Sequence, residues 1–570
     1  MGQKKAEPAS PLRFAPAKVL PQFDEMPAQL QPTSRRSGNY LPTIWDYDVL
    51  ESLLNDKAHD HARNQEVEKM LEDDVRKIMR GLQDDHSALL SLIDDIQKLG
   101  MSYRFEEEIF EGLERLYASK KRNGEDDLHA TALCFRILRQ HGFPVSPDEE
   151  FGRFIDHEGK FLSSICNDIH GLLTMYEASC YGFEGEDLLD EANAFARKHL
   201  INLKNKVEDR ELADQIDVAL ELPMHHRLPI HVAKHTFRKY NGNASLRELA
   251  KLNFELSELM YRKELHDVLS WWRHLDLQNR LGFSRDRIVE IFHAAYVIAS
   301  TTDFSDGRKA LAKTIYLVCF IDDLYDVYGS LEELRLFTKA IDRWDVNDID
   351  ELPEYMRTIF LALCKTSDEM AQEVFKKTGF NCLSHIKEGW RDLCKAFMVE
   401  AEWYFNKQVP TFKDFLDNGW RSIGSITCIN VIYFYLHNEF TQASLDGLNN
   451  LHDAIRYSCI LARVVNDLGT EQNEQQRGDA AKSIKSYVHE KGVSIKDARK
   501  HMKAVIKENW KMYNKAAYNG APPFSRAFLE LVINFTRSNI FWYGNGDGLV
   551  NHYDQIISDL INMLGCNPEG

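Results

Sequence analysis

Three aspartates close an apolar stretch of this sequence. Asp322, Asp323 and Asp326 follow an apolar run that spans residues 315–321. A run without a polar face predicts a helix that is buried all round, and three carboxylates at its end would be costly without cations. If the helix continues, Asp322 and Asp326 share one face with Asp323 beside them, so that their oxygens converge. Clustered carboxylates suit a hard ion such as Mg²⁺, which binds a few carboxylates, waters and phosphate oxygens.

A second set of oxygen donors stands further along the chain. Asn466, Thr470 and Glu474 are spaced by four and four again, which places an amide, a hydroxyl and a carboxylate on one helical face. Either pattern alone would most simply be a solvated helix end. Both patterns in this order are far rarer by chance, so the sequence predicts one metal site built from two helices.

Together the two patterns resemble the aspartate-rich motif and the Asn/Ser/Glu-type motif of class I terpene synthases. The resemblance implies that the motifs face each other across a helical pocket and hold three Mg²⁺ ions, or Mn²⁺ as a substitute, on a small prenyl diphosphate. It also implies an all-α fold of two helical domains. These would be a C-terminal class I terpenoid synthase α-bundle with the metal site and an N-terminal helical (α-barrel) domain.

An arginine pair near the start of the chain resembles the tandem-arginine motif of plant monoterpene synthases. Arg35 and Arg36 are followed by eight residues and then by Trp45. The resemblance implies a segment that folds back over the active site and an association with isomerising and cyclising geranyl diphosphate. Read alone, the pair would be a solvated surface feature. Permanently charged guanidinium groups can nevertheless help to close a lid over a diphosphate.

Four further cations match positions at which the family contacts the diphosphate. Arg285 and Arg287 resemble the Arg-x-Arg element of a loop that closes toward the leaving group. Arg463 and Lys482 fall where the family keeps diphosphate-contacting cations. Together they would supply the local positive field that an acidic chain otherwise lacks.

Three other features concern closure and product. Tyr543 and Asp547 flank a glycine-rich tip that suits a mobile lid, and the matching family segment closes over the pocket. A Gly-Ser pair within residues 422–425 predicts a helix kink with free carbonyls. The resemblance implies that this break faces the reacting cation, and ordinary helix packing is the alternative. Ala294 stands where plant monoterpene synthases commonly place Trp, which puts the usual cation–π wall in doubt.

The elements that position these residues are predicted to be helices, because helical periodicity runs through residues 46–223 and again from 244 onward. Residues 1–34, rich in Pro, Ala and Gln, are predicted to be disordered and to be the remnant of a targeting segment. We assign residues 35–228 to the N-terminal helical domain and residues 229–570 to the C-terminal metal-binding catalytic domain. The histidines of the junction are interpreted as structural rather than metal-binding: His225, His226, His231 and His235.

Composition limits the partners. The 570-residue chain has a net charge of -18 and a pI of about 5.6, which argues against nucleic acid or an anionic membrane. Its apolar runs fall far short of the roughly 20 residues that span a bilayer. Ten cysteines without paired spacing favour a reducing compartment. We expect the plastid stroma, with the cytosol as the alternative, and a monomer or a homodimer.

We therefore predict a Mg²⁺-dependent synthase that ionises geranyl diphosphate, releases diphosphate and forms a monoterpene, predicted to be cyclic. Within the family, two alternatives stay open: an acyclic or alcohol product (linalool, geraniol, myrcene or isoprene) and a sesquiterpene from farnesyl diphosphate. A prenyl chain-elongating enzyme is disfavoured because that class repeats the aspartate-rich motif. Outside the enzymes, the alternative is a non-catalytic helical binding protein, which would show no metal-dependent turnover.

Overall fold

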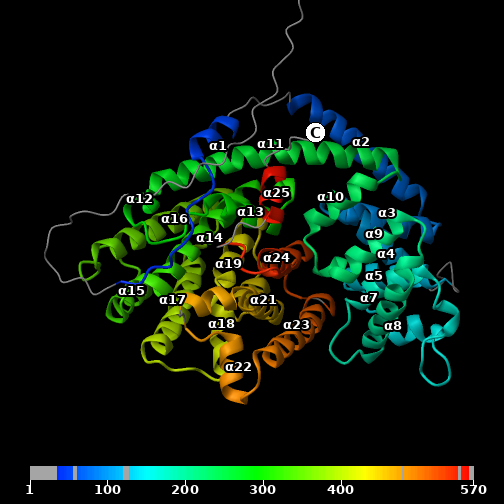
Figure 1. The fold of residues 1–570 in the computed structure, drawn as a ribbon. Coiled ribbons are helices and arrows are strands. Elements are labelled where there is room, and N and C mark those ends of the chain that lie inside the picture. Colours follow the sequence, from blue (N-terminus) through cyan, green and yellow to red (C-terminus); the bar gives the residue numbers. More distant parts are fainter. Residues whose placement is uncertain are drawn as a thin grey trace, which may run out of the picture.

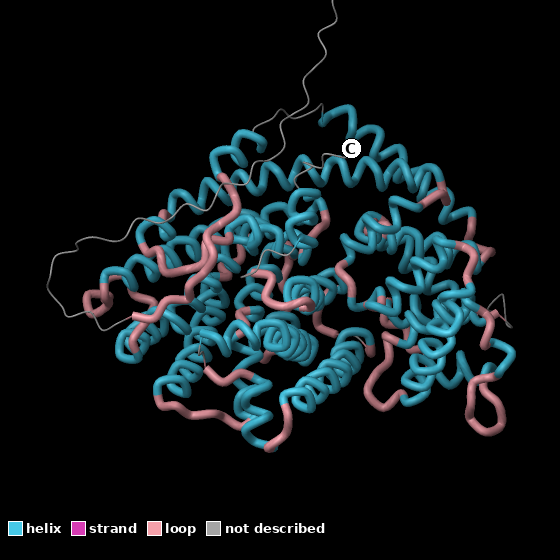
Figure 2. The backbone as a smooth tube through the Cα atoms, viewed as in Figure 1, coloured by secondary structure: helices cyan, strands magenta, loops and turns pink. Residues whose placement is uncertain are grey.

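The structure is a computed structural model that describes residues 35–54, 61–119, 127–477, 480–520, 522–549 and 554–563. The predicted targeting segment, residues 1–34, lies outside these ranges. The described residues form helices joined by loops, and an isolated bridge between Ile155 and Phe161 is the one strand-like pairing among them (Figure 2). The predicted all-α class is thus confirmed.

The first half of the chain forms ten α-helices within the described residues. They are α1 (Tyr47–Leu54), α2 (His61–Gly81), α3 (His86–Lys98), α4 (Glu106–Ala118), α5 (Leu128–Gln140), α6 (Pro147–Phe151), α7 (Ile169–Ser179), α8 (Asp187–Leu203), α9 (Arg210–Glu221) and α10 (Pro229–Lys239).

The second half carries the remaining helices. They are α11 (Ala244–Leu275), α12 (Leu277–Arg280), α13 (Ile288–Ile298), α14 (Ser305–Asp323), the π-helical turn η7 (Leu324–Tyr328), α15 (Leu331–Arg343), α16 (Glu354–Thr378), α17 (Leu383–Phe405), α18 (Phe412–Ser422), α19 (Ser425–Leu436), α20 (Gln442–Asn449), α21 (Asp453–Arg477), α22 (Ser483–Lys491), α23 (Ile495–Tyr518), α24 (Arg526–Tyr543) and α25 (Asp554–Met563).

Two separate apolar cores divide the helices into two domains. The first core lies among α2 to α9, on the right of Figure 1, and the second among α13 to α25. The long helix α11 runs along the top of both. Its first turns place Leu246 in the first core, and its later turns place Leu265 in the second. A helix that carries apolar residues into both cores ties the two domains together.

Residues 35–54 pack against the second core, although the sequence analysis assigned them to the first domain. Trp45 and Leu50 are buried among the residues of that core, and α1 contacts α11. Burial of these two side chains stabilises the docked position. The start of the described chain is therefore a strap across the second domain.

The helix that carries the aspartates changes its winding within the motif. Helix α14 ends at Asp323, and η7 continues it as a π-helical turn in which Gly329 N donates to Leu324 O at 2.8 Å. Such turns are frequent at functional sites. The wider turn replaces the continuous α-helix predicted over Asp322 to Asp326 and changes the directions of its side chains.

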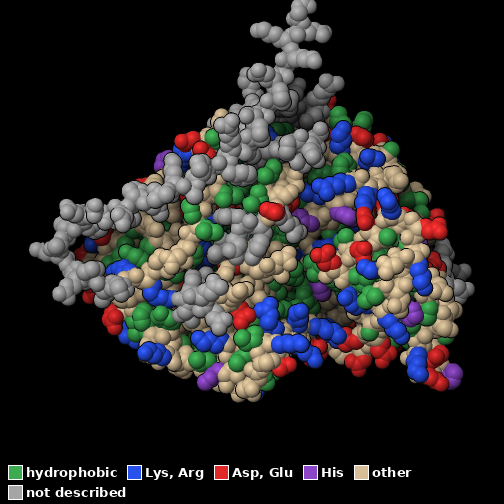
Figure 3. All heavy atoms as spheres, in the orientation of Figure 1, with side chains coloured by type: hydrophobic (Ala, Val, Ile, Leu, Met, Phe, Trp, Pro, Cys, Tyr) green, Lys and Arg blue, Asp and Glu red, His purple; other side chains and the backbone are tan. Residues whose placement is uncertain are grey.

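The surface carries charges of both signs. On the face drawn in Figure 3, basic side chains gather over α23, where Lys496, Lys500, Lys503 and Lys507 are exposed. None of the helices in the described part is both long and apolar enough to cross a membrane.

Candidate active site

A cavity of about 110 Å³ lies between α14, η7, α21 and the end of α24. Most of the residues singled out in the sequence line it, although they come from distant parts of the chain. These are Arg285, Asp322, Asp326, Arg463, Asn466, Thr470, Lys482, Tyr543 and Asp547. The structure thus brings oxygen donors and cations to one place.

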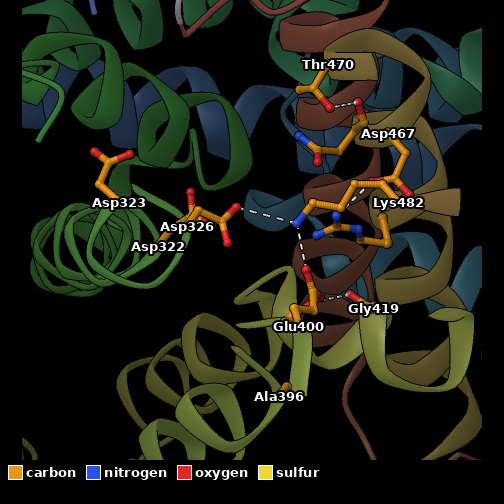
Figure 4. Close-up of polar contacts among 12 residues, drawn as sticks. Asp322, Asp323, Asp326, Ala396, Glu400, Gly419, Asp467, Thr470 and Lys482 are labelled. Carbon is orange, nitrogen blue, oxygen red and sulfur yellow. Dashed lines mark hydrogen bonds and ion pairs between the residues drawn. The ribbon is translucent and has the colours of Figure 1, made fainter. Parts of the chain in front are cut away.

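Asp323 does not join the other two aspartates. Its carboxylate accepts hydrogen bonds from Ser284 Oγ at 2.7 Å, Arg285 N at 2.9 Å and Tyr40 OH at 2.6 Å. Figure 4 shows it turned away from Asp326. Among the described residues, no three His, Cys or acidic side chains converge on one point that could hold a metal. The predicted convergence of all three carboxylates is therefore not observed, because buried partners hold Asp323 elsewhere.

Arg285 forms one wall of the cavity. Its guanidinium lies 2.6 Å from Asp322 Oδ2 and 2.8 Å from Asp323 Oδ1. Burial raises the pKa of Asp322, and the charge of Arg285 opposes this effect. Arg285 therefore compensates the buried acids in this geometry.

Arg287 lies outside the cavity lining, in contrast to its predicted role at the diphosphate. It is buried, and it donates to Leu41 O at 2.8 Å and to Leu549 O at 2.9 Å. These two carbonyls belong to the strap and to the segment after Tyr543. The fork of the guanidinium group joins both segments to the start of α13.

The opposite wall is the helix α21. Asn466 and Thr470 are buried one turn apart, and Thr470 Oγ1 donates to Asn466 O at 3.1 Å. Arg463 Nη2 lies 2.8 Å from Asp467 Oδ1. Glu474 lies one turn beyond Thr470 on the same helix, but its side chain is outside the described part of the structure.

A glycine in the second motif permits close packing. A Cβ atom added to Gly469 would lie 2.3 Å from Tyr543 O, nearer than real Cβ contacts allow. Helix α21 can therefore approach the end of α24 only because position 469 has no side chain. This contact sets the distance between the second motif and Tyr543.

The sequence analysis missed Glu400, a buried acid of α17. Lys482 Nζ lies 2.6 Å from Glu400 Oε2 and 3.5 Å from Asp326 Oδ2, so the ammonium bridges the two acids (Figure 4). Glu400 also accepts a hydrogen bond from Ser422 Oγ. Its one signal in the sequence was that it interrupts, together with Glu402, an apolar stretch of a long helix.

The predicted helix break lies between α18 and α19. Gly424 adopts φ +81, and a Cβ atom there would meet Val318 Cγ1 at 2.5 Å. The turn places Ser422 and Ile423 in the cavity lining. Ala294 lies on α13 and is not among the lining residues.

The strap is fastened to the aspartate-bearing turn. Arg35 Nη2 lies 2.8 Å from Glu333 Oε1, and Arg36 Nη1 donates to Asp326 O at 2.5 Å. The Arg36 guanidinium also lies 4.4 Å from the ring centre of Tyr404, in cation–π contact. Both arginines therefore contact the protein around the motif, and neither is among the residues that line the cavity.

Trp45 anchors the strap to a buried carboxyl group on α13. Its Nε1 donates to Glu290 Oε1 at 3.1 Å. Burial raises the pKa of Glu290 from 4.5 to about 7, while Arg287 and the bond from Trp45 act in the opposite direction. Between these pH values the folded protein holds a proton that the unfolded chain has released.

We expect the contribution of Glu290 to stability to be lost as the pH rises from 4.5 to about 7. Glu290→Gln keeps an acceptor for Trp45 and cannot ionise. Its free energy of unfolding should match that of the wild type near pH 4 and exceed it by up to about 3 kcal/mol at pH 8. Urea unfolding at both pH values measures this. An equal difference in unfolding free energy between variant and wild type at both pH values would contradict an ionisation of Glu290.

The donor set fits a hard divalent cation and a phosphate. Carboxylate, amide and hydroxyl oxygens line the cavity from both walls, with Arg and Lys groups between them. Cys319 also lines it, but burial raises the pKa of its thiol to about 12, so it stays protonated and is a poor ligand. The arrangement can bind a charged leaving group and stabilise charge that develops on it.

Two family models match the chain. Residues 44–220 match the model described as terpene synthase, N-terminal domain, and residues 273–512 match the terpene synthase family, metal binding domain. An isoprene synthase, chloroplastic, of Pueraria montana var. lobata is 41% identical over 94% of this chain and 89% of that protein. A myrcene synthase, chloroplastic, of Quercus ilex is 38% identical over 94% of this chain and 91% of that protein.

Two solved structures are similar to this chain over nearly its whole length. Isoprene synthase from grey poplar leaves, in complex with three Mg²⁺ ions and dimethylallyl-S-thiolodiphosphate, has a TM-score of 0.81 at 38% identity, covering 92% of this chain and 99% of that chain. Limonene synthase with 2-fluorolinalyl diphosphate has a TM-score of 0.86 at 34% identity, covering 93% of this chain and 99% of that chain.

Proposed function

The chain belongs to the plant terpene synthase family and is a class I enzyme of it, and on this basis we propose that it ionises geranyl diphosphate and forms a cyclic monoterpene. The observation that carries the proposal is the cavity in which donors of both motifs meet Arg285, Arg463 and Lys482. Membership of an enzyme family removes the non-catalytic binding protein from consideration.

We assign the Mg²⁺ ligands to two walls. Asp322 and Asp326 would bind from the first wall, and Asn466, Thr470 and Glu474 from the second. When bound, Mg²⁺ supplies Lewis-acid and electrostatic stabilisation of the leaving diphosphate. Asp323 is left out of this set, since its carboxylate is bonded to Ser284, Arg285 and Tyr40 and is not among the residues that line the cavity.

The protein's own residues bind and orient the substrate. Arg463 and Lys482 face the first motif across the cavity and would hold diphosphate oxygens there. Arg285 is paired with Asp322 beside the cavity and would donate from there to oxygens of the leaving group. Tyr543 and Asp547 would close the cavity and keep water from the reacting cation.

Two observations bear on the product. The docked strap with Arg35 and Arg36 supports the monoterpene assignment, because its motif resembles that of cyclising enzymes. The isoprene synthases among the similar proteins favour a second candidate. This candidate is isoprene formation from the five-carbon dimethylallyl diphosphate, as the name of the Pueraria relative suggests. The chloroplastic names of the relatives support a plastid location.

The test is product analysis by gas chromatography. Purified protein is incubated with dimethylallyl, geranyl or farnesyl diphosphate, each with Mg²⁺ and with chelator. Cyclic ten-carbon products that require Mg²⁺ would support the proposal. Isoprene from the five-carbon substrate would favour the second candidate, fifteen-carbon products would indicate a sesquiterpene synthase, and no turnover of any substrate would refute the assigned activity.

A further inference from the structure

A cluster of polar side chains lies beside the end of α24, outside the cavity. Asp559 Oδ2, on α25, lies 2.9 Å from His231 Nε2 and 2.8 Å from His293 Nε2. The ammonium group of Lys234 lies 3.6 Å from Asp559 Oδ1. Three helices distant in sequence meet here, because α10 carries His231 and Lys234, α13 carries His293 and α25 carries Asp559.

The cluster is an anchor built on one carboxylate. His293 is fully buried, and burial lowers the pKa of its imidazole, which is therefore neutral and donates through Nε2. Its Nδ1, the acceptor nitrogen of this tautomer, has no hydrogen-bond partner, so the bond to Asp559 is the ring's one hydrogen bond. Burial alone would raise the pKa of Asp559, but the hydrogen bonds from the two imidazoles lower it. Hydrogen bonds to an ionised carboxylate are the strong kind, and this one receives them from two helices.

The residues just before Tyr543 form a wall of this cluster. Phe541 packs edge-on against His231, with ring centroids 4.8 Å apart. Trp542 packs edge-on against His293, with centroids 5.5 Å apart. Tyr543 follows directly and lines the cavity. The position of Tyr543 is therefore coupled to the two imidazoles through its neighbours on α24.

The segment after Tyr543 is attached to helix α13. Leu549 O accepts a hydrogen bond from Arg287 Nε, at the N-terminal end of α13, and Asp559 bonds to His293 further along α13. Tyr543 and Asp547, which line the cavity, lie in sequence between Trp542, which packs on His293 of α13, and Leu549, which is bonded to Arg287. Helix α13 thus holds the chain on both sides of the cavity-facing residues.

We propose that Asp559 is a positioning residue that, through His231 and His293, fastens residues 541–549 over the cavity. The proposal rests on the function proposed above, since it assigns to this anchor the exclusion of water from a reacting carbocation. A loosened segment would admit water. Water would then add to the cation and lose a proton to solvent, so that an alcohol forms in place of the olefin produced by proton loss from carbon.

The first test compares Asp559→Asn with Asp554→Asn, which makes the same change at the exposed first residue of α25. We expect Asp559→Asn to raise the ratio of alcohol to olefin about threefold or more, and to lower kcat about tenfold with little change in KM. Amide hydrogen exchange of residues 541–549 should become about tenfold faster. Asp554→Asn should leave all three measurements at wild-type values.

A second pair of variants separates anchoring from folding. His293→Gln keeps a side-chain N–H donor for Asp559, whereas His293→Leu keeps the packing volume and loses the donor. We expect the glutamine variant to retain the wild-type product ratio and the leucine variant to behave like Asp559→Asn. Thermal unfolding of each variant identifies any loss of the fold.

Several outcomes would overturn the role of Asp559. They are equal exchange rates in Asp559→Asn and Asp554→Asn, a wild-type product ratio in His293→Leu, and faster exchange with an unchanged product ratio. If the wild-type protein turns over no prenyl diphosphate, the proposed function fails. Hydrogen exchange in the same variants then decides by itself whether Asp559 fastens the segment.

Discussion

Asp326→Asn should lower kcat for the prenyl diphosphate about a hundred- to thousandfold, because removing one group that stabilises the developing charge has effects of this size. Asp326 lines the cavity and is one of the two acids that Lys482 bridges. The asparagine is nearly isosteric but carries no charge to hold a divalent cation. Steady-state kinetics over a Mg²⁺ series should also show a higher Mg²⁺ requirement.

The matched control is Asp84→Asn, at one of the paired acids of the N-terminal domain. Asp84 is exposed and lies in the other domain, so its substitution should leave kcat and the Mg²⁺ requirement unchanged. Asp323→Asn offers a contrast, because it would disturb the bonds to Ser284 and Tyr40 and so lower stability. An Asp326→Asn enzyme with wild-type kinetics at every Mg²⁺ concentration would remove Asp326 from the ligand set.

Lys482→Met should reduce both activity and stability. The substitution removes a cation from the cavity and leaves Glu400 buried without its ammonium partner. Burial alone would raise the pKa of Glu400, but the nearby Lys482 ammonium lowers it. The pair is therefore ionised in the folded protein. Breaking a buried pair by removing one partner costs about 3–5 kcal/mol. Urea unfolding and steady-state kinetics measure the two effects.

The double variant Lys482→Met/Glu400→Gln separates them. Glutamine removes the unpaired charge and can still accept from Ser422, so most of the lost stability should return. Activity should stay about a hundredfold below that of the wild type, since the cavity still lacks the cation. Recovery of activity together with stability would mean that Lys482 serves only to compensate Glu400.

Local spacing accounts for what could be predicted. The helical period identified Asp322 and Asp326, and Asn466 and Thr470, as donors on two helices, and the structure places all four around one cavity. The helix break was also predictable, since Gly424 occupies the left-handed region that favours glycine. These features depend on residues within one or two turns.

Contacts between distant segments account for what could not be predicted. Asp323 accepts from Tyr40, 283 residues away, and Lys482 contacts Glu400, 82 residues away. Arg287 was expected at the diphosphate, but the carbonyls of Leu41 and Leu549 hold it outside the cavity. No periodicity encodes such contacts, because they form only when three or more segments are already packed.

The sequence by itself determined the class of the protein, the two donor sets and the hard cation that they suit. Helix period and donor chemistry are properties of neighbouring residues, and the family resemblance rests on the same stretches. The tertiary structure alone decided which donors face the cavity. It turned Asp323 and Arg287 away, added Glu400 and anchored the strap, because a buried polar group is oriented by whichever partner the packed chain brings within hydrogen-bonding distance.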